Sequence, residues 1–203
     1  MKLWFVRLGA YVLNNKLLFC LFLACNTTSA LAAVDEYTID PNHTYPSIEF
    51  SHMGLSVWRG KFNKSSGRIA IDRSANGGTV EVIIETASIN FGLDAMDEKA
   101  RSEDFFDVAR YPTATYTGTL NLVDGQPTTV DGQITIMGAT RPLKLTVNTF
   151  KCIPHPVLQR EVCGADAEGD LNWSEYGMKM SKWGAGEAGK VHLRIQVEAL
   201  KRD

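Results

Sequence analysis

Near the end of the chain stands the segment Lys190-Val-His-Leu-Arg-Ile-Gln-Val-Glu-Ala199, in which apolar and polar side chains alternate without a break. Successive side chains of a β-strand point to opposite faces, so Val191, Leu193 and Ile195 share one face and the polar side chains share the other. The segment therefore predicts a strand with one face buried in a core and the other face in water.

The same alternation recurs along most of the chain, and turn signals rich in glycine, asparagine and proline separate the runs. The predicted strands are Tyr37–Asp40, Ser47–Met53, Val57–Phe62, Gly67–Ile71, Thr79–Thr86, Thr113–Leu122, Val130–Met137, Arg141–Phe150, Cys163–Asn172 and Lys190–Leu200. The short turn Gly138-Ala-Thr140 predicts a hairpin. This pattern indicates an all-β domain, an antiparallel β-barrel whose closed sheet can hold an apolar ligand.

One segment breaks the alternation. Asp94-Ala-Met-Asp-Glu-Lys-Ala-Arg-Ser102 is rich in helix formers, and its first residue is expected to cap the helix. Ser102 is expected to begin a second helical turn that would direct Phe105 and Phe106 inward. We therefore expect a short helical insert around residues 94–107 that closes one end of the barrel.

The start of the chain has the features of a secretory signal. Lys2, Arg7 and Lys16 precede an apolar run over residues 17–25, and Ala30-Leu31-Ala32 offers small residues for cleavage. The apolar run is shorter than the roughly 20 residues that span a bilayer. We expect export and cleavage rather than a membrane anchor.

The expected domains are a signal peptide over residues 1–32 and a barrel over residues 33–203. An alternative is a lipoprotein signal that ends at Leu23-Ala24-Cys25 and leaves Cys25 acylated. The whole chain holds 21 basic and 23 acidic residues, and the signal removes three of the basic ones, which leaves a net charge of −5. Without a basic run, the domain is not expected to bind nucleic acid.

Two cysteines, Cys152 and Cys163, remain in the exported domain. An even pair in an exported chain predicts a disulfide, here at the base of a hairpin. A metal site that uses both cysteines and His155 would need a fourth ligand, and none is evident nearby. We expect a disulfide that stabilises the loop and no metal site.

Small residues recur on strand faces that otherwise carry bulky ones, and two interpretations are open. In one they leave volume inside the barrel, and in the other they mark the bulges and bends that closure requires. They are Gly60, Ala114, Gly118, Gly132, Ala165, Ala167 and Gly169. Taken together, they favour an internal cavity.

A series of short motifs runs in order along residues 35–200. They are Tyr37-Thr-Ile-Asp40 with His43, Ile48-Glu-Phe50, His52-Met-Gly54, Gly60-Lys-Phe62 with Gly67, Arg101-Ser-Glu-Asp-Phe-Phe106, Tyr111-Pro112 and Gly132-Gln-Ile-Thr-Ile-Met-Gly-Ala-Thr-Arg-Pro142. Together they resemble the YceI-like family. This resemblance implies a lipocalin-like antiparallel β-barrel in the bacterial periplasm that binds long polyisoprenoid chains, including isoprenoid quinones and polyprenyl phosphates. The chain departs from simpler members in its Cys152–Cys163 loop and in Trp173-Ser-Glu-Tyr-Gly-Met178.

The leading hypothesis is a periplasmic binding or carrier protein that holds a polyisoprenoid, or a similar long apolar lipid, inside the barrel. Six aromatic residues are expected to contact the lipid chain: Phe50, Trp58, Phe62, Phe91, Phe106 and Tyr116. His52 shares an apolar face with Ile48 and Phe50, and it is expected either to bind the polar end of the ligand or to be a core histidine. Arg101 is expected to meet a phosphate, or else to pair with a nearby acid.

No enzyme activity and no cofactor are expected, because the sequence has neither a Gly-x-Ser-x-Gly motif nor a phosphate-binding loop. The expected partners are a long-chain isoprenoid lipid and either membrane proteins or transient membrane contact, with the protein a monomer or homodimer. One alternative is a hydrolase for a lipid-like substrate with His52 as base. Another is a stress-related or structural module with a filled core and no ligand.

Overall fold

The computed structural model describes residues 34–179 and 189–203. The expected signal peptide over residues 1–32, and the alternative lipoprotein signal at Cys25, lie outside these residues and stay predictions. None of the described helices has the length and apolar character that crossing a membrane requires.

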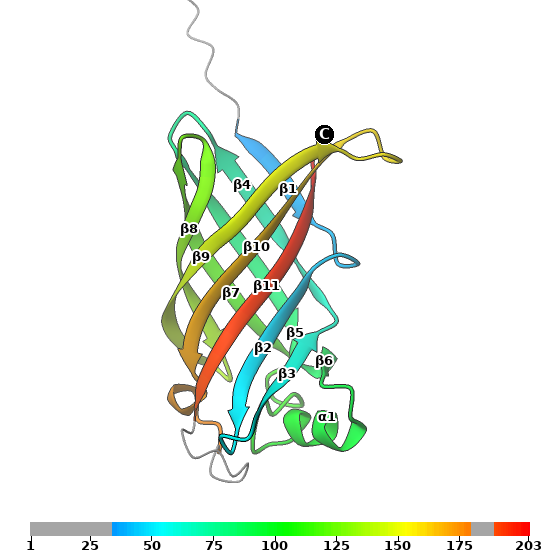
Figure 1. The fold of residues 1–203 in the computed structure, drawn as a ribbon, viewed down its shortest axis with the longest axis vertical. Helices are drawn as coiled ribbons and strands as arrows, with labels where there is room; N and C mark the ends of the chain where they lie inside the picture. The colour runs from blue at the N-terminus through cyan, green and yellow to red at the C-terminus, as the bar shows by residue number, and fades with distance from the viewer. Residues whose placement is uncertain (1–33, 180–188) are drawn as a thin grey trace, which may run out of the picture. The chain divides into compact units, whose positions relative to one another are not determined.

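The described residues form one antiparallel sheet of 11 strands (Figure 1). The strands are β1 (Asp35–Ile39), β2 (Tyr45–His52), β3 (Ser56–Phe62), β4 (Ser65–Asp72), β5 (Gly77–Glu85), β6 (Ile89–Asn90), β7 (Thr113–Val123), β8 (Gln126–Ile136), β9 (Ala139–Pro154), β10 (Glu161–Asn172) and β11 (Lys190–Lys201). Each predicted strand is present, and β6 is an addition that was too short to show a pattern. The prediction of an all-β antiparallel barrel is confirmed.

The sheet closes into a ring of eight strands in the order β1, β4, β5, β7, β8, β9, β10 and β11. The closing pairs join β1 to the end of β11, with Tyr37 opposite Lys201 and Ile39 opposite Ala199. Lower on the same edge, β11 pairs with β2, where Arg194 lies opposite Ser47. The strands β2, β3 and β6 therefore form a flap that branches from the ring at β11.

The alternation in β11 sorts its side chains as predicted. Val191, Leu193 and Ala199 are buried, whereas Arg194 and Gln196 are exposed. Because the ring is closed, the buried faces of all its strands meet in one interior.

Two tight turns connect β7, β8 and β9. Asp124 and Gly125 join the first pair, and Met137 and Gly138 join the second. All four residues have positive φ, between 49° and 75°, which is the conformation of the type I′ turns that match the twist of antiparallel strands. The hairpin predicted at Gly138 is confirmed, with its turn one residue earlier than expected.

The helical insert is α1 (Asp94–Arg101). The expectation that Asp94 caps this helix is wrong, because Leu93 occupies the cap position without a side-chain hydrogen bond and Asp94 is already helical. The second helical turn is also absent, since residues 102–107 form turns. Phe105 and Phe106 are buried as predicted, with 1% and 4% of their surfaces exposed. Figure 1 shows α1 beside β3 and β6, at the end of the barrel where β2 and β3 turn.

The described residues also contain two short 3-10 helices. They are η1 (Thr86–Ser88) between β5 and β6, and η2 (Trp173–Tyr176) directly after β10. The η2 helix places Trp173 and Tyr176 in the core.

The disulfide prediction is confirmed. Cys152 of β9 and Cys163 of β10 lie directly opposite each other, with their Cα atoms 4.0 Å apart, and their sulfurs are bonded. The bond encloses the hairpin between the two strands at the end of the barrel away from α1 (Figure 1).

Replacing both cysteines (Cys152→Ser with Cys163→Ser) should lower the free energy of unfolding by about 3 kcal/mol, because a loop of this length then gains freedom in the unfolded chain. Urea denaturation followed by circular dichroism measures the change. The same denaturation of the unmutated protein under reducing conditions should give the same loss, and equal stability of the two forms would contradict the prediction.

Candidate ligand-binding cavity

The interior of the barrel contains a cavity of about 150 Å³. Every strand of the ring contributes lining residues, and β2 and β3 of the flap contribute Ile48 and Phe62. The lining is almost wholly aliphatic or aromatic. The cavity is therefore a product of the inward faces that the alternation predicted.

The cavity is long and narrow. Along β10 its lining extends from Cys163 to Leu171, which is roughly 25 Å of strand at about 3.3 Å per residue. Its volume is nevertheless below the roughly 300–1,000 Å³ that is usual for pockets of compact ligands. This shape suits an extended single chain better than a bulky ring system.

Several inward-facing residues keep part of their surface exposed although they lie inside the barrel. Ile69, Val82, Val147, Ile195 and Val197 are half-buried, and all of them line the cavity. A hydrocarbon chain that covers this apolar surface would be stabilised by about 25 cal/mol for each Å² removed from water.

The hydroxyl groups at the cavity wall have protein partners. The Tyr116 hydroxyl lies 3.1 Å from the carbonyl oxygen of Leu143, and Thr44 donates to the carbonyl oxygen of Glu198. The Tyr37 hydroxyl donates to a carboxylate oxygen of Glu161 at 2.7 Å. Because these hydroxyl groups are already paired, the wall favours contact with apolar groups over hydrogen bonding to a polar head group.

Burial raises the pKa of the Tyr116 hydroxyl above its ordinary value, and the nearby Asp131 carboxylate adds to the effect. Burial likewise raises the pKa of Tyr37, with a further contribution from its hydrogen bond to Glu161. Both phenols therefore stay protonated at physiological pH and remain donors to their protein partners.

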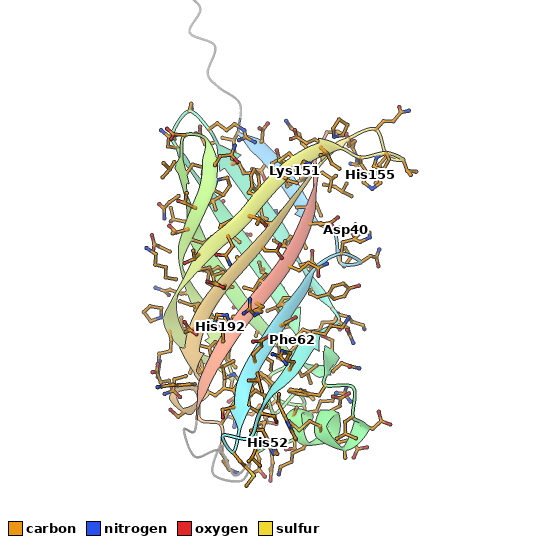
Figure 2. All side chains as sticks on the ribbon, viewed as in Figure 1. Asp40, His52, Phe62, Lys151, His155 and His192 are labelled. Atoms are coloured by element: carbon orange, nitrogen blue, oxygen red, sulfur yellow. A yellow bond between two sulfur atoms is a disulfide. The ribbon has the colours of Figure 1, made fainter. Side chains whose placement is uncertain are left out.

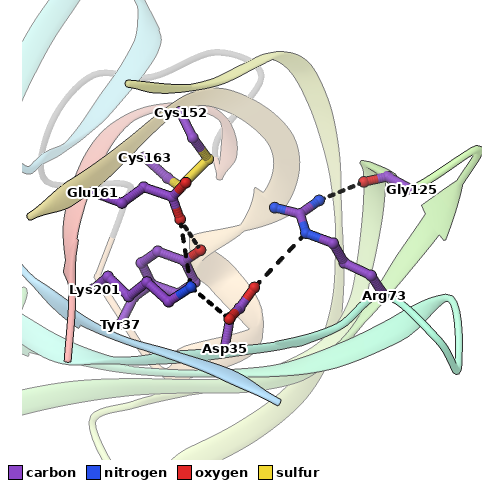
Figure 3. The surroundings of a disulfide bond; sticks show 8 residues. All are labelled: Asp35, Tyr37, Arg73, Gly125, Cys152, Glu161, Cys163 and Lys201. Carbon is purple, nitrogen blue, oxygen red and sulfur yellow. Dashed lines mark hydrogen bonds and ion pairs between the residues drawn. A yellow bond between two sulfur atoms is a disulfide. The ribbon is translucent and has the colours of Figure 1, made fainter. Parts of the chain in front are cut away.

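A charged cluster lies next to the disulfide at one end of the cavity (Figure 3). Lys201 contacts Asp35, with Nζ to Oδ1 at 2.6 Å, and Asp35 also lies 3.8 Å from Arg73. Tyr37 connects this cluster to the cavity, because its ring lines the cavity while its hydroxyl reaches Glu161. The apolar interior thus ends in a polar, charged rim at the disulfide end.

The opposite end is aromatic. Phe62 and Phe106 line the cavity with their ring centres 5.5 Å apart, and Trp173 lies 5.9 Å from Phe106. Trp173 also contacts Phe50 at 5.1 Å. The rings form a continuous cluster from the cavity wall towards the β2–β3 turn.

The predicted contact residues fall into two groups. Phe62, Phe106 and Tyr116 line the cavity. Phe50, Trp58 and Phe91 do not line it but pack behind that wall, with Phe50 in edge-to-face contact with Trp58 at 6.2 Å and with Phe91 at 6.0 Å. Ligand contact by any of the six remains a prediction.

The two predicted polar residues lie outside the cavity wall. His52 stacks on Trp58 with ring centres 4.2 Å apart, at the end of β2 (Figure 2). Arg101 donates from Nε to the carbonyl oxygen of Ala87 at 2.8 Å and from Nη2 to that of Ile89 at 2.9 Å. The guanidinium thus attaches α1 to the backbone around β6, and its role towards a phosphate stays a prediction.

The expectation that glycines leave volume open is wrong at four positions, because neighbouring side chains cover them; at Gly118 a Cβ atom would lie 2.7 Å from the Val130 side chain. A Cβ atom on Gly60 would lie 2.6 Å from the Phe91 ring, and one on Gly132 would lie 2.5 Å from the Tyr116 hydroxyl. Gly169 is covered by Leu145 in the same way. These glycines allow close packing. The alanines predicted with them do line the cavity: Ala114, Ala165 and Ala167.

Sequence reasoning missed three aromatic residues of the lining. Tyr37 and Phe150 lie on the inward faces of β1 and β9, and Trp173 follows the end of β10. The alternation contained a signal for Tyr37. It contained none for Trp173, which lies in η2 beyond the strand pattern.

A closed antiparallel barrel of eight strands around an apolar cavity is the architecture of lipocalin-like binding proteins. The family model of the YceI-like domain matches residues 37–199, and the chain belongs to this family.

The chain is similar to curated relatives along most of its length. Protein YceI of Escherichia coli O6:H1 is 27% identical over 193 residues, which cover 94% of this chain and 100% of that protein. A UPF0312 protein of Pectobacterium atrosepticum is 29% identical over 175 residues, with coverage of 86% and 90%.

Solved structures share the fold. BcnA of Burkholderia cenocepacia matches with a TM-score of 0.62 at 20% identity, over 79% of this chain and 98% of that one. A protein of Saccharophagus degradans, described as a polyisoprenoid binding domain implicated in plant cell wall breakdown, matches with a TM-score of 0.59 at 15% identity, over 82% and 98%.

The substitution Tyr116→Phe should lower the free energy of unfolding by about 1 kcal/mol, because a buried carbonyl loses its donor. It should leave any co-purifying lipid unchanged, since the hydroxyl bonds to the backbone and not to a ligand. Denaturation and mass spectrometry of an organic extract measure the two quantities. The matched control is Tyr45→Phe, which removes an exposed hydroxyl and should cost less than about 0.5 kcal/mol.

Proposed function

We propose that the protein binds and carries a long apolar lipid of the polyisoprenoid class, with the hydrocarbon chain inside the barrel. The single observation that carries the proposal is the narrow apolar cavity that every strand of the ring lines. The Saccharophagus degradans domain, described as polyisoprenoid-binding, has the same fold and supports this ligand class. We further propose that the protein works in the periplasm after export.

The hydrophobic effect supplies enough free energy for such binding. Each five-carbon isoprene unit that leaves water is stabilised by about 4 kcal/mol, at about 0.8 kcal/mol per carbon. Association itself costs on the order of 4–15 kcal/mol. A few isoprene units inside the cavity therefore outweigh that cost, and a short lipid would not be retained.

The cavity wall favours a ligand whose polar part stays outside it. Tyr37, Thr44 and Tyr116 already bond to protein groups. An isoprenoid quinone and a polyprenyl phosphate share the chain that the wall recognises, and they differ in the group that would remain at an end of the barrel. We therefore propose that selection acts on the chain first.

Mass spectrometry of an organic extract tests the proposal. Protein purified from its native compartment should release a long-chain isoprenoid lipid. The variant Ala165→Trp should retain more than tenfold less, because displacing two methylene groups costs about 1.6 kcal/mol, or roughly a factor of ten in affinity.

The matched control is Thr119→Trp, which places the same indole on the exposed outer face of β7 and should retain lipid like the unmutated protein. Unfolding midpoints of both variants establish that they are folded. Repeatedly empty extracts of the unmutated protein, or equal retention by both variants, would rule the carrier out.

The hydrolase alternative assigns His52 the role of a base, and the structure supports a different role. Its ring stacks on Trp58 outside the cavity wall. Such a ring pair contributes about 0.5–1.5 kcal/mol to the stability of the fold. Because this pair does not touch the cavity, replacing His52 should lower lipid retention by less than about twofold. The test compares His52→Ala with the unmutated protein in both lipid retention and ester hydrolysis. Hydrolysis that disappears in the variant would favour the enzyme.

A further inference from the structure

The hairpin between β9 and β10 projects beyond the rim of the barrel (Figure 1). Its tip carries exposed apolar side chains. Val157 is 78% exposed, Leu158 46% and Ile153 45%. Exposing several large apolar side chains to water on one loop is unfavourable, and such groups mark interaction sites.

The hairpin is held in one conformation. The Cys152–Cys163 disulfide closes its base. At its tip, the Nδ1 atom of His155 accepts hydrogen bonds from the backbone N–H groups of Val157 and Leu158, at 3.1 and 3.0 Å. These bonds lower the cost of ordering the loop when its apolar side chains make contact.

Towards its tip the hairpin carries only cations, because its one carboxylate, Glu161, lies at the base and accepts a hydrogen bond from Tyr37. Residues 151–160 include Lys151 and Arg160 and no carboxylate. Lys151 is exposed on the outer face of β9, and Arg160 lies 3.8 Å from Asp203 near the chain end. Apolar side chains flanked by cations match the surface of a bilayer that contains anionic lipids.

We propose that this hairpin docks the protein on an anionic phospholipid bilayer, with Val157 and Leu158 entering between the head groups. The hairpin offers three large exposed apolar side chains, far fewer than the roughly 20–30 residues that a stable protein interface uses on each side. A bilayer accepts such a tip, because lipids move aside for it.

The docking deepens the proposed function and rests on it for its purpose. Phe150 and Cys163, at the base of the hairpin, line the cavity. Docking therefore brings the disulfide end of the cavity to the membrane, where a water-insoluble lipid can be exchanged. Docking itself is measurable whether or not the cavity holds lipid.

The β2–β3 turn provides a matched comparison at the other end of the barrel. Leu55 is 81% exposed there, as open as Val157, but residues 51–58 contain no lysine or arginine. If exposed apolar surface alone caused membrane binding, the two ends of the barrel would contribute equally.

The experiment is flotation of the exported chain with vesicles of phosphatidylglycerol and phosphatidylethanolamine. The double variant Val157→Asp with Leu158→Asp should lower the partition coefficient more than tenfold, since burying each side chain is worth about tenfold or more. Lys151→Gln should lower it about fivefold on these vesicles and not on neutral phosphatidylcholine vesicles. Leu55→Asp should change it less than twofold, because that end of the barrel does not contact the bilayer.

Other measurements keep the two proposals separate. The double variant should keep its lipid in the organic extract and its unfolding midpoint, and Ala165→Trp should keep vesicle binding. Vesicle binding that survives in the double variant, or is lost only in Leu55→Asp, overturns the docking proposal. A dimer in sedimentation that the double variant abolishes, without a change in vesicle binding, assigns the hairpin to a second copy of the chain and also overturns it.

Discussion

The pairing of β1 with the end of β11 is the constraint on which the rest of the structure depends. Where Tyr37 lies opposite Lys201, eight strands of the sheet close into a ring, which leaves fewer unpaired strand edges. An open sheet with the same alternation would expose its apolar face or aggregate through it. Closure turns that face into an interior, and the interior then contains the cavity.

The two ends of this interior differ chemically. At one end the rings of Phe62, Phe106 and Trp173 join the cavity to the packed flap of β2 and β3. At the other end Tyr37 joins the cavity to carboxylates and cations beside the disulfide. A chain with one polar end matches this difference, since its tail suits the aromatic end and its head group the charged rim.

In the proposed docking, the disulfide hairpin brings the cavity to the membrane that supplies the lipid. The match to the YceI-like family model covers residues 37–199, which include the loop between Cys152 and Cys163 as well as the barrel. In the proposed docking, the exposed side chains of Val157 and Leu158 contact the membrane, and neither residue lines the cavity. Binding and docking are therefore separable properties of one domain.

The sequence by itself determined which side chains face inward, because strand alternation is a local property that survives any arrangement of the strands. It also predicted the Cys152–Cys163 bond and the burial of Phe105 and Phe106. Only the tertiary structure decided that β11 pairs with both β1 and β2. It also decided that Phe50 packs behind the cavity wall and that Arg101 attaches α1 to neighbouring backbone. Those outcomes depend on contacts between segments far apart in the chain, where lateral packing and register select a partner that no local pattern specifies.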